Sequence, residues 1–507
     1  MPPSSPNRPS RGRPPPRGRP PSRGRPPSRG RPLHRAPARP VSGSTPRGTR
    51  LDSLPSLPGL VQRLAATLAL AHVETDRAYA AKALEDGWRE AGGSERDDRA
   101  LATELVLGTW RWRGILDGHL APLLPRGLES LDDVTRQTLR VAAYELLGPH
   151  PTPAHAAVHL AVETAKRLRN RSLAGLVNAV LHRLARAAAE DAASGSWTKN
   201  EQRSAKNASL ALPPWLQARF TTAWGEADAL AIARWSLERP GRALRVNRRR
   251  DDAAKVVSAF SGAVPSPHAP WVLRLAAGAG DLRSHPFVAT GRVTVQEEGA
   301  ALAAEALPVG AGGIVLDACA GRGTKTTALA ERLPADATLL AADANPDKLA
   351  RIAPELERLG LPPVEILAVD WNVGVAGIAG SFDAILVDAP CTGTGTLSRR
   401  PELRWRLEPA DVARLVELQA AVLARTSSLL APGGALLYVV CSLLPEEGAD
   451  QVRALLRSRD DLSLVADALP LPPWRRLETG AVLLPHESGT DGFFAALLRR
   501  RSSRRRS

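Results

Sequence analysis

The sequence is poor in cysteine: its 507 residues include three, Cys319, Cys391 and Cys441. Three thiols are too few, and an odd number, for a disulfide framework. None of them belongs to a Cys-x-x-Cys pair with the spacing of a zinc site. We therefore expect no bound metal and a reducing compartment.

The sequence also lacks a long uninterrupted apolar run. The stretch Leu429–Leu444 comes nearest to the length that crosses a bilayer, but Pro432, Gly433 and Gly434 interrupt it. The first residues are rich in arginine and proline and contain no apolar segment of the kind found in secretory signals. These absences predict a soluble, cytoplasmic protein with no membrane partner.

Acidic residues are missing from both ends of the chain. Residues 1–50 contain thirteen arginines and no acid, and Arg499–Ser507 contains six arginines and no acid. Because the whole chain carries +16, residues 51–498 carry a net charge of −3. A uniformly basic nucleic-acid binder is thus excluded, and any basic surface on the body must be local. The tails either attract RNA through dispersed arginines or have no defined role.

Composition and periodicity divide the chain into six segments. Apolar residues recur at intervals of three and four through the first half of the body, and strands alternate with helices in the second half. We predict a multidomain protein that combines an all-α bundle with an α/β domain. The boundaries are 1–54 for a disordered Arg/Pro-rich tail, 55–190 for an all-α bundle of five to seven helices, 191–208 for a linker, 209–291 for a small α/β connector, 292–498 for the α/β domain and 499–507 for an Arg-rich tail.

Five apolar runs of the last large segment read as strands of one parallel, doubly wound sheet: Ile314–Asp317, Thr338–Asp343, Glu365–Val369, Ala384–Asp388 and Ala435–Cys441. In the strand order 3-2-1-4-5, the carboxyl ends of strands one, four and five are neighbours. The three cysteines follow these three strands. We therefore expect the thiols to gather at the ligand-binding edge of the sheet. Helices are also expected over Pro214–Trp224 and near Glu226–Leu237, with a short strand at Leu244–Asn247.

A glycine-containing turn follows the first of these strands, in GGIVLDACAGRGTKT. Gly321 and Gly323 allow close approach of a ligand to the backbone, and the helix behind them offers free N–H groups. Asp343, twenty residues after Gly323, ends the next strand and is placed to accept ribose hydroxyls. This pattern indicates a nucleoside-bearing cofactor. The form D-x-x-x-G-x-G favours S-adenosylmethionine over a dinucleotide without deciding between them.

Thiols beside a methyl donor fit one reaction in particular. Carbon 5 of cytosine is too poor a nucleophile to take a methyl group directly, but a thiolate that adds at C6 turns C5 into an enamine-like carbon. A carboxylic acid near N3 favours that addition. Asp388 together with Cys391 and Cys441 meets this requirement. Asp370, after the third strand, is expected near the adenine, or alternatively caps a helix or lies in a solvated turn.

The motifs as a set resemble one family. DACAGRGTKT, AADANPDKL, VDWN, VDAPCTGTGTLSRRPELRW, LLYVVCSLLPEEG and GTDGFFAALL resemble the motif series of the Nop/Sun RNA (cytosine-5) methyltransferases, whose catalytic domain has a Rossmann-like class I fold. DRALATELVLGTWRWRGILD, RQTLRVAAYELL, PAHAAVHLAVETAK and LAGLVNAVLHRLAR look like a NusB-type RNA-binding domain. This pairing resembles the bacterial RsmB/Sun subfamily, which methylates 16S rRNA, and it covers roughly residues 60–498.

The resemblance implies roles for individual residues. Cys441 is implied as the nucleophile that attacks C6, Cys391 as an aid to product release, and Asp388 as a contact to both the target cytosine and the methyl donor. Asp343 is implied at the ribose and Asp370 at the adenine. The implied cradle of the methionine moiety consists of Cys319, Ala320, Gly321, Arg322, Gly323, Thr324 and Lys325. The chain departs from the family here, because Gly321, Arg322 and Thr324 stand where Ala, Pro and Gly are frequent.

Other interpretations stay open. DNA cytosine-5 methyltransferases attack with the cysteine of a Pro-Cys motif, which here is Cys391. A NusB-like RNA-binding or antitermination protein with an inactive methyltransferase half is a second alternative. An NAD-dependent dehydrogenase is disfavoured, because no acid/base pair for hydride transfer accompanies the glycine turn.

Arginines after the fourth strand are candidate RNA contacts. Arg399, Arg400 and Arg404 follow the Pro-Cys loop and are placed to bind phosphates beside an extruded cytosine, or else form ordinary salt bridges. Trp405 either stacks on a base or belongs to the core. The expected partner is 16S rRNA, and the protein is expected to act as a monomer.

Overall fold

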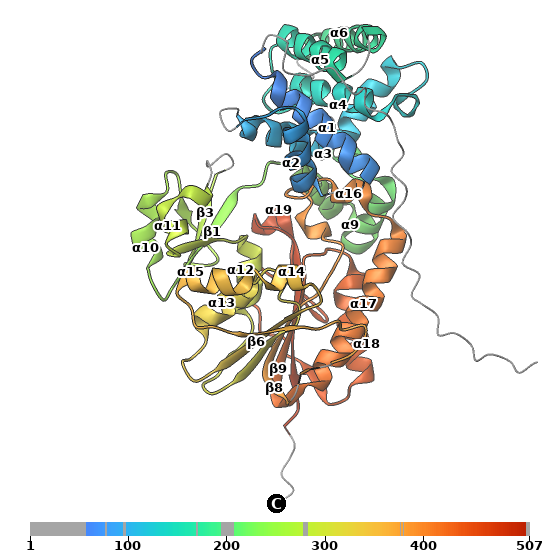
Figure 1. The fold of residues 1–507 in the computed structure, drawn as a ribbon. Helices are drawn as coiled ribbons and strands as arrows, with labels where there is room; N and C mark the ends of the chain where they lie inside the picture. The colour runs from blue at the N-terminus through green and yellow to red at the C-terminus, as the bar shows by residue number, and fades with distance from the viewer. Residues whose placement is uncertain are drawn as a thin grey trace, which may run out of the picture. The chain divides into compact units, whose positions relative to one another are not determined.

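The computed structural model describes residues 57–76, 79–94, 98–168, 171–193, 207–276, 282–375, 377–378 and 380–502 (Figure 1). The contacts reported below lie within one unit, residues 51–507. The expected tail over 1–54, most of the expected linker over 191–208 and residues 503–507 lie outside the described residues.

The first described part is an all-α bundle, as the 3–4 periodicity predicts. Its apolar residues, among them Leu64, Leu70, Val106 and Leu139, are buried in one continuous core. Asp98 is the N-cap of the helix over Arg99–Leu120, and its carboxylate accepts hydrogen bonds from two backbone N–H groups of the first turn. The helices are α1 (Leu60–Asp76), α2 (Ala80–Glu90), α3 (Arg99–Leu120), α4 (Asp133–Leu147), α5 (Ala154–Leu168) and α6 (Arg171–Ala193), with short 3₁₀ turns η2 (Ala121–Leu123) and η3 (Leu128–Ser130).

A small α/β part follows. Its helix α9 spans Pro214–Leu237 and is interrupted at Gly225, whose φ of 80° lies in the left-handed region. The sequence predicted two helices that meet at this glycine. The four-stranded antiparallel sheet has the order β2-β3-β1-β4. Its elements are β1 (Arg242–Val246), α10 (Ala253–Val256), η4 (Val257–Ala259), β2 (Val264–Pro265), β3 (Val272–Leu275), η5 (Leu282–Ser284), α11 (Pro286–Ala289) and β4 (Val293–Val295).

Five neighbouring strands of the largest sheet are parallel, in the order β7-β6-β5-β8-β9, with β7 at one edge of the sheet. Read in chain order, this is the predicted arrangement 3-2-1-4-5, and the α/β fold class is confirmed. The strands are β5 (Ile314–Asp317), β6 (Thr338–Asp343), β7 (Glu365–Ala368), β8 (Phe382–Asp388) and β9 (Leu430–Val440). The helices before, between and after them are α12 (Glu298–Glu305), α13 (Thr324–Arg332), α14 (Pro346–Leu349), α15 (Ile352–Leu359), α16 (Leu403–Arg406), α17 (Pro409–Ser428) and α18 (Ala449–Ser458), with η6 (Thr394–Thr396) and η7 (Pro445–Glu447).

Alternate residues of the central strands feed two separate cores, as a sheet covered on both faces requires. Val315 and the strand residues that point to the same face of the sheet pack with residues of α12, α13 and α15. Leu316 and the strand residues that point to the opposite face pack with residues of α17 and α18. In Figure 1 these two groups of helices lie on opposite sides of the sheet.

Antiparallel strands extend the sheet beyond β9, and the sequence did not predict them. They are β10 (Leu462–Leu464), β11 (Arg475–Leu477), β12 (Gly480–Leu483) and β13 (Phe493–Arg500), with α19 (Pro485–Ser488) between the last two. Strand β13 pairs with β9, with Phe494 opposite Val440. The turn that leads into β13 is thereby held against the loop after β8, where Gly492 N donates to Gly395 O at 2.8 Å.

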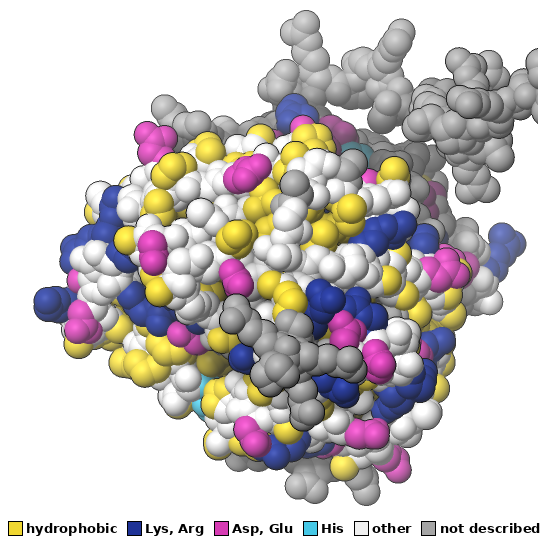
Figure 2. All heavy atoms as spheres, turned by 90° about the horizontal axis from the view of Figure 1, so that it is seen from below, with side chains coloured by type: hydrophobic (Ala, Val, Ile, Leu, Met, Phe, Trp, Pro, Cys, Tyr) yellow, Lys and Arg dark blue, Asp and Glu magenta, His cyan; other side chains and the backbone are white. Residues whose placement is uncertain are grey.

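Charges of the body are mixed rather than separated. On the face shown in Figure 2, Lys and Arg side chains are interspersed with Asp and Glu, in line with the nearly balanced charge of residues 51–498. Among the described residues, no helix combines the length and apolarity that crossing a bilayer requires.

Candidate active site at the carboxyl ends of β5, β8 and β9

Two thiols meet at the carboxyl edge of the sheet. Cys391 follows β8 by three residues and Cys441 directly follows β9, and these parallel strands are neighbours, with Asp388 opposite Val439. The Sγ atoms of Cys391 and Cys441 lie 3.4 Å apart. Both side chains are partly exposed. Cys391 and Cys441 therefore lie together at the carboxyl edge of the sheet, as predicted.

A lysine–carboxylate pair lies beside the thiols. Lys325, in the first turn of α13, donates from Nζ to Oδ2 of Asp388 at 2.7 Å. Burial alone lowers the pKa of Lys325, but the adjacent Asp388 carboxylate outweighs it and raises that pKa. The ammonium group also lies 5.4 Å from the ring centre of Phe493 in β13. Lys325 is therefore a fixed positive charge at this edge of the sheet.

The two thiols differ in acidity. Their mutual hydrogen bond lowers the pKa of Cys441, and Lys325 and Arg400 add to this against burial and the Asp388 charge. The same hydrogen bond, followed by burial, raises the pKa of Cys391 well above its ordinary value. These directions favour ionisation of Cys441 before Cys391, and once Cys441 is ionised, Cys391 is the partner that can donate the hydrogen bond to its thiolate.

The glycine turn lies next to the end of β6. Gly321 has a φ of 56°, and a side chain built on it meets no atom within 4 Å. Gly321 N donates to Oδ2 of Asp343 at 2.9 Å. Gly323 has a φ of 85°, and a Cβ there would lie 2.9 Å from Ile352. A side chain at Gly323 is excluded twice, by backbone strain and by contact, whereas the turn at Gly321 opens outward beside a carboxylate.

The remaining predicted cofactor residues surround this turn. Ala320 N donates to Ala342 O at 2.8 Å, which fixes the turn between β5 and β6. Burial, then the charge of Asp317, raises the pKa of Cys319 well above its ordinary value. Arg322 and Asp370 are exposed, and Oδ1 of Asp370 accepts from Asn372 N at 2.9 Å. Their roles toward a cofactor stay predictions.

Asp317, the last residue of β5, belongs to the same edge and was not among the predicted site residues. It is fully buried, and burial raises its pKa to about 7. Its Oδ2 accepts from Thr326 Oγ1 at 2.7 Å, and its Oδ1 has no hydrogen-bond partner among the described residues. An acid that ends an apolar strand directly before a glycine turn was the available signal.

The three predicted RNA-contacting arginines have different surroundings. Arg400 is exposed. Arg399 is partly exposed and donates from Nε to Oδ2 of Asp491 at 2.8 Å. Arg404 is fully buried and donates to backbone carbonyls of Leu397, Ala211, Ser236 and Arg111 and to the Ser236 hydroxyl. With no exposed surface to offer a phosphate, Arg404 does not contact RNA, and that prediction is wrong. Burial lowers its pKa to about 9.

Trp405 belongs to the packing between the Pro-Cys segment and the helical bundle. Its Nε1 donates to Trp110 O at 3.0 Å, and the guanidinium of Arg113 lies 5.2 Å from its ring centre. Of the two predicted alternatives, the structure favours the core position over a base-stacking surface.

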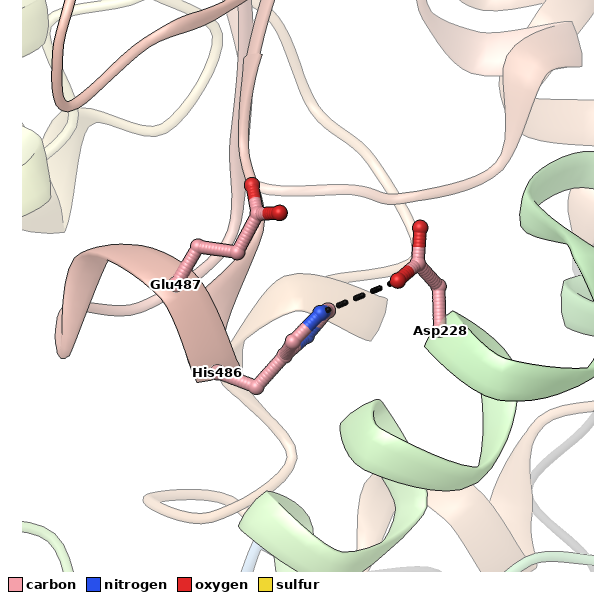
Figure 3. Close-up of side chains that lie close together, drawn as sticks. All are labelled: Asp228, His486 and Glu487. Atoms are coloured by element: carbon pink, nitrogen blue, oxygen red, sulfur yellow. Dashed lines mark hydrogen bonds and ion pairs between the residues drawn. The ribbon is translucent and has the colours of Figure 1, made fainter.

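A second cluster of titratable side chains lies where α19 meets α9 (Figure 3). Asp228, His486 and Glu487 place one ligand-type atom each within 4.8 Å of one another. His486 Nε2 lies 3.3 Å from Asp228 Oδ1, and Arg475 binds both Asp228, at 2.7 Å, and Glu487. The hydrogen bond from Arg475 lowers the pKa of Asp228. Because the guanidinium of Arg475 already neutralises the two carboxylates, we interpret this cluster as a set of polar contacts that connects α9 to α19 and not as a cation site.

Comparison with family models finds two matches. Residues 304–499 match the model described as 16S rRNA methyltransferase RsmB/F, and residues 61–186 match the model of the NusB family. The first match covers the sheet with the two thiols, and the second covers the helical bundle.

Relatives match across most of the chain. Ribosomal RNA small subunit methyltransferase B of Pseudomonas syringae is 34% identical, over 86% of this chain and 96% of its own length. A Mycobacterium tuberculosis protein named as a methyltransferase is 37% identical, over 80% of this chain and 89% of its own length. The crystal structure of PH0851 matches with a TM-score of 0.71 and 25% identity, over 88% of this chain and 100% of that chain.

Proposed function

Since the chain belongs to the RsmB/F family of 16S rRNA methyltransferases, we propose that it methylates carbon 5 of a cytosine in 16S rRNA through a covalent bond between Cys441 and C6. The observation that carries this proposal is the 3.4 Å pair of Cys391 and Cys441. The ion pair of Lys325 and Asp388 beside it supplies the charged groups that the chemistry needs.

The cofactor of this reaction is S-adenosylmethionine, which when bound supplies an electrophilic methyl group. The outward-opening turn at Gly321 and the carboxylate of Asp343 beside it fit the methionine and ribose parts. We assign the cradle to residues 319–325, the ribose hydroxyls to Asp343 and the adenine side to Asp370. Asp388 binds Lys325 of this cradle, and its charge acts on the Cys441 thiol, so we assign it contacts to both the cofactor and the target base.

The thiolate of Cys441 begins the reaction. It forms a bond to C6, and the electron pair of the C5–C6 double bond becomes available at C5. That carbon would take the methyl group as the methyl–sulfur bond of the cofactor breaks, with S-adenosylhomocysteine as the leaving group. Negative charge that the addition places on N3 is neutralised by the ammonium group of Lys325, which the Asp388 carboxylate holds at this edge. The lowered pKa of Cys441 favours this residue over Cys391 as the nucleophile.

Product release requires the reverse bond change. A base removes the proton from C5, the C5–C6 double bond forms again, and the bond between C6 and Cys441 Sγ breaks. Cys391, whose Sγ lies 3.4 Å from that of Cys441, is the residue that we assign to assisting release, as the hydrogen-bond donor to the leaving sulfur and not as the base. The leaving Cys441 thiolate regains the hydrogen bond from Cys391 that stabilises it.

RNA is held, in this proposal, by the exposed Arg400 and the partly exposed Arg399 after the Pro-Cys loop, and by the helical bundle. A base inside an RNA helix cannot reach a thiol at the edge of the sheet, so the target cytosine must be extruded or lie in a single strand.

Purified protein, labelled S-adenosylmethionine and 16S rRNA test this proposal. We expect label in 5-methylcytosine, and a stable adduct with RNA that carries 5-fluorocytosine at the target, because fluorine cannot leave as the C5 proton does. Cys441→Ala should abolish the adduct, whereas Cys391→Ala should form it and release product slowly. An adduct in Cys441→Ala that is lost in Cys391→Ala would reverse the roles, and label on any other position would refute the proposal.

A further inference from the structure

A buried glutamate lies between the two loops that carry the thiols. Glu447 ends η7, six residues after Cys441, and is completely buried. Its carboxylate accepts hydrogen bonds from Thr392 N at 2.8 Å, from Gln419 Nε2 at 3.0 Å, and from the hydroxyls of Thr392 and Ser442. Four donors converge on one side chain.

Three of the four donors belong to residues that directly follow a cysteine in the chain. Thr392 follows Cys391, and Ser442 follows Cys441. Gln419, from α17, also donates to Pro390 O at 2.8 Å, so the peptide on the other side of Cys391 is held as well. Glu447 therefore fixes both backbone segments from which the thiols project.

Further bonds hold the two loops to each other around this centre. Thr394 Oγ1 lies 2.9 Å from Ser442 Oγ, and Gly395 N donates to Cys441 O at 3.0 Å. The hydroxyl of Tyr438, in the strand that leads to Cys441, donates to the backbone carbonyl of Glu447 at 2.6 Å. The glutamate is thus anchored to the strand of one cysteine while its carboxylate reaches the loop of the other.

The residue type follows from the hydrogen-bond chemistry. An ionised carboxylate is an acceptor only, with two oxygens that can take four hydrogen bonds, and all four partners of Glu447 are donors. Among the described residues, no Lys, Arg or His forms an ion pair with Glu447. A buried carboxylate without a cation is costly unless hydrogen bonds replace its hydration, which they do here. A glutamine would place an NH₂ group where a donor already points.

We propose that Glu447 is a positioning residue that sets Cys391 and Cys441 at their 3.4 Å separation, so that one loop cannot move relative to the other during the reaction. Its catalytic consequence rests on the proposed function, whereas its effect on the thiol separation does not. Glu447 touches neither thiol and acts through Thr392 and Ser442.

The test compares Glu447→Gln with Glu446→Gln. Glu446 is the neighbouring residue in η7, but its carboxylate is partly exposed and binds Arg219. The first readout is closure of the Cys391–Cys441 disulfide by diamide, in which both thiols are oxidised and the azo group takes up two electrons and two protons. The second is the rate of methyl transfer to rRNA, and the third is binding of S-adenosylmethionine.

For Glu447→Gln, we expect methyl transfer to fall about 100-fold, the effect of a shift of about 1 Å in a reacting group. Disulfide closure should slow by about tenfold or more, after correction for the reactivity of each thiol, which is measured by alkylation in proteins that keep only Cys391 or only Cys441 of the pair. Binding of S-adenosylmethionine should stay within about twofold. Glu446→Gln should match the unmodified protein in all three. Wild-type closure and transfer in Glu447→Gln would overturn the proposal.

A second pair of variants tests the same proposal in case Glu447→Gln does not fold. Thr392→Val removes the hydroxyl that donates to Glu447, and Thr392→Ser keeps it. We expect slowed closure and transfer in the valine variant and recovery in the serine variant, with equal thermal melting temperatures. Equal closure rates in both would overturn the proposal. If the unmodified protein transfers no methyl group to cytosine while closure still depends on Glu447, the proposed function fails and the positioning role stands.

Discussion

Arg111 of α3 donates two hydrogen bonds to the carbonyl oxygen of Ser398, at 3.3 Å from Nε and 3.0 Å from Nη2. Ser398 lies in the segment that follows the Pro-Cys loop, and the neighbouring carbonyl of Leu397 accepts from Arg404 at 2.7 Å. Arg404 also donates to the backbone of Arg111. Two buried guanidinium groups thus hold adjacent carbonyls, and one of them comes from the helical bundle. The segment after the loop of Cys391 is fixed to the helical bundle through its backbone.

Replacing Arg404 should destabilise the protein strongly. Arg404→Leu leaves the carbonyls of Ala211, Ser236 and Leu397 buried without this donor, so the free energy of unfolding should fall by about 3 kcal/mol. Urea unfolding measures this. Arg414→Leu, at an exposed arginine of α17, should change it by less than about 0.5 kcal/mol. Equal effects of the two substitutions would contradict the role given to Arg404.

The acidity of Cys441 should depend on Cys391. The hydrogen bond from Cys391 is the main cause of the lowered pKa of Cys441, so Cys391→Ala should raise that pKa. The measurement is the rate of iodoacetamide alkylation of Cys441 against pH, followed by mass spectrometry. We expect the profile to move to higher pH in Cys391→Ala. An unchanged profile would mean that the thiols do not share a proton in solution.

Local patterns were enough to predict the central sheet. The apolar runs that end at Asp317, Asp343 and Asp388 became β5, β6 and β8, because each run is bounded by residues that end a strand. The order of the parallel strands and the meeting of Cys391 with Cys441 followed from the fold class. These features depend on residues close in sequence or on topology rules that many sequences share.

Long-range polar contacts were not predictable in the same way. Arg404 was expected at the surface because it is a charged residue. The backbone carbonyls that accept its hydrogen bonds in the interior belong to residues as distant in sequence as Arg111 and Ala211. Glu447 was missed for the same reason, since its donors lie 5 to 55 residues away. Such partners are brought together only by the tertiary fold.

The charge of Lys325 should matter for catalysis. Lys325→Met removes a cation that lowers the pKa of Cys441 and leaves Asp388 without its ion-pair partner. Single-turnover methyl transfer at neutral pH should slow by about 100-fold or more, and a higher pH should restore part of the rate by ionising the thiol. Lys255→Met, at an exposed lysine of α10, is the matched control and should leave the rate unchanged. A loss that pH does not relieve would assign Lys325 to positioning of Asp388 alone.

Asp491 should make stability depend on pH. Burial, then the nearby Glu297 carboxylate, raises the pKa of Asp491 to about 8, against its ordinary value of 3.8. Between about pH 4 and pH 8 the folded state therefore holds a proton that the unfolded state has released, and the free energy of unfolding falls as pH rises. Asp491→Asn carries no titrating proton and should show a flatter dependence, by on the order of 2 kcal/mol across this window.

Urea unfolding at several pH values measures the difference between the two proteins, which removes the contribution of other titrating groups. Asp450→Asn, at an exposed carboxylate of α18, should keep the slope of the unmodified protein. Parallel curves for Asp491→Asn and the unmodified protein would show that Asp491 is ionised in the folded state.

The N-terminal tail should affect how tightly RNA binds but not which base is modified. Its thirteen arginines lie outside the described residues and carry a charge that the body, at −3, does not share. Each phosphate contact that is lost should make the dependence of log affinity on log salt shallower by about 0.7 for single-stranded RNA. Deletion of residues 1–50 should therefore weaken binding most at low salt, as measured by filter binding over a salt series. Because Cys441 and its surroundings are untouched, bisulfite sequencing of the product should place the methyl group on the same cytosine, and a shifted position would show that the tail takes part in choosing the target.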